Sequence, residues 1–101
     1  MIRASFGIRN SSAEFTVKGH SGYAQAGSDI VCAAVSSAVY MAANTVTEIL
    51  KVDAAADVKD GYLKFSFSGS EAATDIVRGL KLHIEELAAQ YPDSIKVTTE
   101  V

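Results

Sequence analysis

Residues 2–18, IRASFGIRNSSAEFTVK, contain two segments in which apolar and polar residues alternate. A period of two places one face of a strand in a core and the other in solvent. The segments are separated by Asn10-Ser11-Ser12, residue types that favour turns. We therefore predict a strand over residues 2–8, a second over residues 13–18, and a hairpin between them.

A long helix is predicted after this hairpin. Residues 19–28 contain three glycines and no periodicity, which indicates a loop. Ser28 is a suitable N-cap, and Asp29 suits the positive end of a helix that runs to about Leu50. The apolar residues at helical spacing are Val31, Val35, Ala38, Ala42, Val46 and Ile49.

The second half of the chain repeats this order of elements. Asp60-Gly61 lies between strand-like segments at residues 52–59 and 63–68, which predicts a second hairpin. Ser70 can cap a second helix, and Pro92 ends it. The apolar residues of this helix are Ala73, Val77, Leu80, Ile84, Leu87 and Tyr91, and Ile95, Val97 and Thr99 suggest a final strand.

The predicted fold class is α+β, with the order ββαββαβ. Two hairpins and two amphipathic helices bury their apolar faces as a two-layer sandwich, with both helices on one face of a mostly antiparallel, five-stranded sheet. We expect the other face to stay polar unless a second subunit covers it. The 101 residues fit a single domain over residues 1–101.

Composition limits which classes of binding partner and which cellular compartment fit this protein. The net charge is −3 and the cations are scattered without a basic run, so we expect no direct nucleic-acid binding. No signal peptide is visible, and the apolar stretch over residues 30–43 is too short to cross a membrane. A single cysteine cannot form an internal disulfide. We expect a soluble, cytoplasmic protein.

Cys32 and His20 are the candidate catalytic residues. Cys32 lies near the start of the long helix, where the peptide dipoles favour the reactive thiolate. A buried, inert cysteine is the alternative, and position alone favours it. His20 lies where a strand ends and a glycine-containing loop begins, and that loop is long enough to bring it to Cys32. On its own, a surface histidine would be the simpler interpretation.

The stretch over residues 19–37, GHSGYAQAGSDIVCAAVSS, resembles the signature of the ribosomal-processing cysteine protease family, Prp. In that family a Gly-His pair is followed about a dozen residues later by Asp-Ile-Val-Cys-Ala and then a serine. The resemblance implies that Cys32 is the nucleophile and His20 the general base. Asp29 matches the aspartate of the motif, and it either orients the imidazole or stabilises the helix.

Other residues of the stretch are candidates for substrate binding: Gly19, Ser21, Gly22, Tyr23, Gly27 and Ser36. Ser21 stands where alanine is expected in many relatives, a change of little consequence because the side chains are similar in size. Ser36, one turn after Cys32, either contacts the sulfur or bonds back to the helix. No metal and no organic cofactor is expected.

The resemblance implies an endopeptidase that removes a short N-terminal extension from a large-subunit ribosomal protein precursor. It also implies an extended, apolar substrate segment, and we expect a homodimer. The main alternative is a non-catalytic, ribosome-associated interaction module in which Cys32 is inert. A thiol redox sensor is a further alternative, but it lacks a second cysteine to resolve the oxidised form.

Overall fold

A computed structural model of the chain describes residues 1–19 and 26–100, with the backbone alone described over residues 26–29. The strands are β1 (Ile2–Ile8), β2 (Ala13–Lys18), β3 (Ala54–Lys59), β4 (Tyr62–Phe67) and β5 (Ile95–Glu100). The helices are α1 (Ala26–Asn44), which continues into a π-helical turn η1 (Thr45–Ile49), and α2 (Glu71–Gln90). The predicted order ββαββαβ is confirmed.

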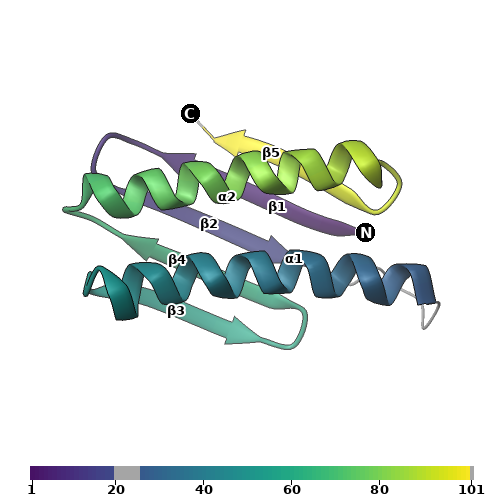
Figure 1. Cartoon of the computed structure of the whole chain (residues 1–101), viewed down its shortest axis with the longest axis horizontal. Coiled ribbons are helices and arrows are strands. Elements are labelled where there is room, and N and C mark those ends of the chain that lie inside the picture. The colour runs from purple at the N-terminus through teal and green to yellow at the C-terminus, as the bar shows by residue number, and fades with distance from the viewer. Residues whose placement is uncertain (20–25, 101) are drawn as a thin grey trace.

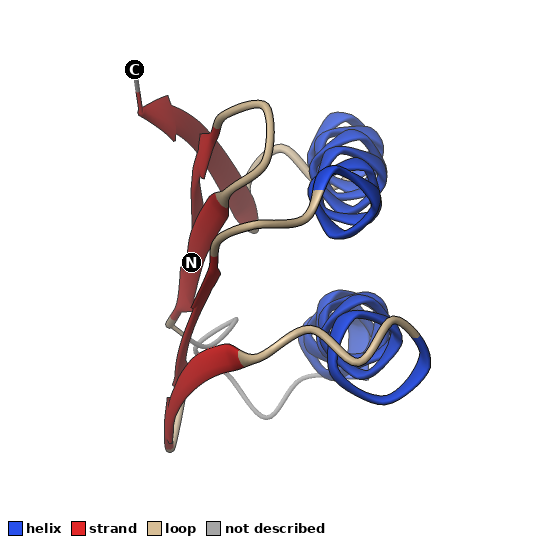
Figure 2. Ribbon diagram, turned by 90° about the vertical axis from the view of Figure 1, so that its left-hand side faces the viewer, coloured by secondary structure: helices blue, strands red, loops and turns tan. Residues whose placement is uncertain are grey.

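The five strands form one sheet in the order β3-β4-β2-β1-β5 (Figure 1). β1 and β5 are parallel, and the other neighbouring pairs are antiparallel. α1 connects β2 to the parallel strand β3, and α2 connects β4 to the parallel strand β5. The two connections run in opposite directions across the sheet from strands of opposite direction, so right-handed crossovers place both helices on the same face. Figure 2 shows this predicted two-layer arrangement.

The core lies between the sheet and the helices, and a row of phenylalanines crosses its strands. Phe6 of β1 pairs with Phe15 of β2, which pairs with Phe65 of β4. The ring centroids are 5.8 Å apart for Phe6 and Phe15 and 5.3 Å apart for Phe15 and Phe65. Such cross-strand aromatic pairs fix the register of the sheet, since a shift by one residue would expose every ring.

The start of α1 differs from the prediction. The helix begins at Ala26, so Gly27 and Ser28 belong to its first turn and not to the preceding loop. Ser28 therefore cannot be the N-cap, because the cap residue precedes the first helical residue.

The end of the long helix also differs. The last five residues form η1, in which the Leu50 N–H donates to the Thr45 carbonyl, five residues back, at 2.9 Å. A π-helical turn contains an extra residue, so the apolar face shifts around the axis. Val46 is consequently the last buried residue of this long helix. The prediction that Ile49 lies on the core face was wrong, since Ile49 is 73% exposed.

The apolar stretch of the same helix is longer than the residues 30–43 named from the sequence. Residues Ile30–Ile49 are long and apolar enough by composition alone to cross a membrane, with a mean hydropathy of 1.5. The expectation concerned residues 30–43, and the helix extends this apolar stretch to Ile49. A core helix accounts for the composition, because one face is buried against the sheet: Val31, Val35, Val39, Ala42 and Val46.

α2 begins and ends near the predicted residues. The Ser70 Oγ accepts a hydrogen bond from the Ala73 N–H at 3.0 Å, which confirms the predicted cap. Ala73, Val77, Leu80 and Ile84 are buried as expected. Tyr91 is not on the buried face, because it follows the last helical residue and is 39% exposed.

Replacing Ser70 with alanine should lower the free energy of unfolding by about 1 kcal/mol, because the Ala73 N–H loses its acceptor. Thermal unfolding should show a midpoint roughly 4–8 °C lower. Ser68→Ala is the matched control, since Ser68 is an exposed serine just before the helix. Equal midpoints for the two variants would contradict the role of the Ser70 side chain as a cap.

Candidate active site

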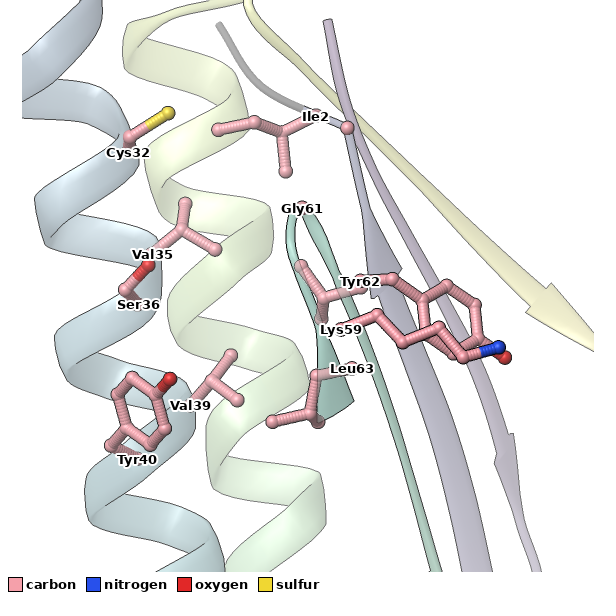
Figure 3. Close-up of a pocket in the computed structure, with 12 residues that line it drawn as sticks. Ile2, Cys32, Val35, Ser36, Val39, Tyr40, Lys59, Gly61, Tyr62 and Leu63 are labelled. Carbon is pink, nitrogen blue, oxygen red and sulfur yellow. The ribbon is translucent and has the colours of Figure 1, made fainter. Parts of the chain in front are cut away.

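A cavity of about 170 Å³ lies between α1 and the strand ends that face it (Figure 3). Its α1 wall contains Cys32, Ser36 and Tyr40. The residues that complete the lining are Ile2, Val17, Gly19, Val35, Val39, Lys59, Gly61, Tyr62 and Leu63. The walls therefore combine five aliphatic side chains with glycines and polar residues, and the one cysteine of the chain lines this cavity.

Cys32 is the seventh residue of α1 and is half-buried. Its neighbours Val31 and Val35 face the core, which fixes the direction of the helix face that carries the sulfur. Because α1 begins at Ala26, Cys32 lies in the second turn. This agrees with the expectation that Cys32 lies near the start of the helix, although the field of the helix dipole is strongest one turn earlier.

Gly19 holds the end of β2 against the rest of the site. Its N–H donates to the Gly61 carbonyl in the β3–β4 turn at 2.9 Å. Its φ is 96°, a conformation that residues with a side chain rarely adopt, and an added Cβ would overlap the carbonyl oxygen of Met1. Gly19 is the residue before His20, so these contacts fix where the chain leaves the sheet toward His20.

The structure describes only part of the predicted site. His20, Ser21, Gly22 and Tyr23 lie outside the described residues. Gly27 and Asp29 lie in the first turn of α1, where the backbone alone is described. Cys32, Ser36 and Gly19 line the same cavity, so the structure brings together the described members of the predicted site.

Several residues of the cavity were not predicted as site residues. Ile2 comes from β1, and Gly61 and Leu63 come from the β3–β4 hairpin. Only β2 separates β1 from β4 in the sheet, so residues of β1 and of the β3–β4 hairpin line the same cavity as Cys32. No feature of the linear sequence links them to the cysteine. Among the described residues, no group of three or more His, Cys, Asp or Glu is placed to hold a metal ion.

The sequence matches the cysteine protease Prp family over residues 1–96. The chain belongs to this family. It is therefore a cysteine protease. A curated relative, the ribosomal processing cysteine protease Prp of Bacillus subtilis, is 30% identical over 95 residues, which cover 86% of this chain and 85% of the relative.

Solved structures share the Prp fold along nearly the whole chain. The Streptococcus mutans protein SMU.848 is 30% identical, with a TM-score of 0.79, and the alignment covers 98% of this chain and 93% of that protein. A ribosomal processing protease Prp of Staphylococcus aureus, solved in complex with a substrate peptide, has a TM-score of 0.83. This alignment covers 99% of this chain and 100% of the Staphylococcus aureus protein. At 16% identity, the likeness concerns the fold alone.

Proposed function

We propose that this member of the Prp family removes an N-terminal extension from a large-subunit ribosomal protein precursor, with Cys32 as the nucleophile and His20 as the general base. One observation carries the assignment of Cys32. The chain is a cysteine protease with a single cysteine, and that cysteine lines a cavity between α1 and the sheet. A cysteine protease needs a thiol as its nucleophile, so Cys32 is the only residue that can supply it.

The assignment of His20 rests on the geometry next to it. Gly19 lines the cavity together with Cys32, and its hydrogen bond to Gly61 fixes the point from which His20 continues. His20 takes the thiol proton, and the Cys32 sulfur attacks the carbonyl carbon of the scissile bond. The C–N bond breaks, His20 gives the proton to the departing amine, and an acyl-enzyme remains. His20 then activates the water that hydrolyses the thioester.

The lining of the cavity supports the proposal that it binds an apolar side chain of the substrate, next to the scissile bond. Val35 and Val39 of α1 face Leu63 of β4 across it, and none of the three is polar. Backbone N–H groups of the first turn of α1 are the proposed donors to the oxyanion, because the first four N–H groups of a helix have no partner within it.

The test is cleavage of a peptide that spans the N-terminal junction of the ribosomal protein precursor. Mass spectrometry should detect two products, and a rapidly quenched reaction should contain protein carrying the N-terminal segment as a thioester on Cys32. A scrambled peptide of the same composition is the control. Intact authentic peptide after prolonged incubation would overturn the substrate assignment.

Two roles stay open for Asp29, and the same assay separates them. If Asp29 orients the imidazole, Asp29→Ala should lose as much activity as His20→Ala at unchanged stability. If Asp29 stabilises the first turn of α1, Asp29→Ala should keep most activity and unfold at a lower temperature.

We also propose that the protein is a cytoplasmic homodimer. The outer surface of the helix layer supports dimerisation, because it exposes Ile30, Met41 and Leu82, each at least 60% accessible. A hollow between α1 and α2 lies on the same surface and is lined by Ala34, Ala38 and Gly79. A reducing compartment fits a chain with one cysteine. The solution mass, measured by light scattering, should equal that of two chains.

A further inference from the structure

The open face of the sheet, opposite the helices, carries a row of four cations and one tyrosine that crosses all five strands. The pairing register aligns Lys59 with Tyr62, Tyr62 with Lys18, Lys18 with Arg3, and Arg3 with Lys96. The strand neighbours of Arg3, Lys18, Tyr62 and Lys96 belong to the core or pack against it, so these four side chains face outward, and the register places Lys59 beside Tyr62 on the same face. We call these five residues the basic row: Arg3, Lys18, Lys59, Tyr62 and Lys96.

The basic row brings like charges together at a cost in stability. Arg3 lies directly between Lys18 and Lys96, and like charges on opposed strand positions are destabilising. Within residues 1–19 and 26–100, no ion pair joins any of these three side chains to a carboxylate. The chain has more carboxylates than cations, so neutralising partners were available elsewhere in the sequence. A ligand of negative charge would offset the repulsion.

The charges of the open face are partly sorted along the strands. Lys64 lies in the next row of residues, where its partner on β3 is Asp57, which is also 3.9 Å from the Lys59 Nζ. Glu14 and Glu100 lie at the opposite end, aligned with Gly7. A hollow of about 400 Å³ occupies the basic end, and the hydroxyl residues Ser5, Thr16 and Thr98 line it together with Arg3, Lys18, Lys64 and Lys96. One carboxylate, Glu100, also reaches this hollow and accepts a hydrogen bond from the Ser5 Oγ at 3.4 Å. Cations and hydroxyls are the side chains that contact phosphate oxygens.

Tyr62 gives the row a second chemical property. It is half-buried, it lies between Lys59 and Lys18, and its ring is 5.5 Å from the Lys59 Nζ. An aromatic ring among cations on an open sheet can stack an unpaired base while the cations follow the backbone. The row spans four strand spacings, or roughly 19 Å. Single-strand sites of small β domains cover about 4–16 nucleotides, so this length is sufficient.

From this placement we propose that the open face of the sheet binds single-stranded nucleic acid, with the phosphates along the basic row and a base on Tyr62. From the sequence we expected no nucleic-acid binding, because the net charge is −3 and no two cations of the basic row are close together in the chain. An acidic protein segment would be attracted to the cations but would not need the ring.

The first test is fluorescence anisotropy with a labelled oligouridine RNA of about 12 nucleotides. The wild-type protein should bind with a Kd of roughly 10⁻⁴–10⁻⁶ M at physiological salt and more tightly at low salt, and log K should fall linearly with log salt concentration. Arg3→Gln/Lys96→Gln should weaken binding at least about tenfold and reduce the salt slope by about 1.4, or 0.7 for each lost contact. Arg9→Gln/Lys51→Gln, which removes the same charge from loops away from the row, should change neither.

The second test uses the ring. Tyr62→Leu should weaken RNA binding about tenfold, and Tyr62→Phe should restore it, because stacking needs the ring and not the hydroxyl. An oligothymidine DNA of equal length tests whether the face binds RNA or single-stranded DNA. The nucleic acid that binds more tightly is assigned as the ligand. Thermal unfolding checks that all variants are folded.

Three results would overturn the proposal. They are no binding by the folded wild-type protein at low salt, equal weakening by the two double variants, and binding of polyglutamate as tight as that of RNA with no effect of Tyr62→Leu. The last result would assign the face to an acidic protein segment.

Discussion

Replacing Cys32 with serine is expected to reduce kcat/KM for cleavage of the precursor peptide by about 10⁴-fold or more, because loss of a nucleophile in a catalytic unit has effects of this size. A serine hydroxyl is a much weaker nucleophile than a thiolate when paired with the same histidine. Cys32 is half-buried and serine is similar in size, so the free energy of unfolding should change by no more than about 1 kcal/mol. Cleavage rate and thermal unfolding are measured on the same preparation.

The control for this variant is Ser37→Ala. Ser37 is exposed on the same helix and lies outside the cavity that contains Cys32, so this variant should cleave at the wild-type rate. The Cys32→Ser protein should still bind the peptide, since the cavity walls are unchanged. A Cys32→Ser protein that cleaves as fast as wild type would remove Cys32 from the mechanism.

Replacing Gly19 with alanine is expected to reduce cleavage about 10²-fold, the effect of a displacement of about 1 Å in a reacting group. A Cβ at this position would overlap the Met1 carbonyl oxygen, and the φ of 96° is unfavourable for alanine. The chain must therefore shift where it leads into His20. The strain should also lower the free energy of unfolding by about 1–3 kcal/mol.

Gly69→Ala separates the two effects. Gly69 also has a positive φ, 81°, but a Cβ there would meet nothing within 4 Å, and the residue lies outside the cavity. This variant should lose stability and retain full activity at a temperature where it is folded. Equal activity of the Gly19→Ala and Gly69→Ala proteins would show that Gly19 does not position His20.

Most elements of the fold were predictable because each depends on neighbours in the sequence. The alternation of Ile2, Ala4 and Phe6 predicts both the strand and its buried face. Ser70 predicts the start of α2 because capping involves residues within one turn. The same local reasoning failed at both ends of the long helix. The start lies at Ala26, and the π-helical turn turns Ile49 away from the core.

For the site, the sequence identified what a linear motif can contain. The spacing of Gly19, His20, Asp29 and Cys32 indicated the family, and the match over residues 1–96 confirmed it. The single cysteine followed from composition alone. The walls of the cavity did not, because Ile2, Cys32 and Leu63 are separated by about thirty residues at each step.

The sequence by itself therefore determined the element order, the hairpins, the Ser70 cap of α2 and the chemistry of the motif, all of which depend on residues close together in the chain. Tertiary structure alone decided the strand order β3-β4-β2-β1-β5, since that order depends on which strands the two helices connect. That order makes a cavity around Cys32, and it aligns Arg3, Lys18 and Lys96 in one row. Pairing across strands is a contact between distant residues, and no local pattern records it.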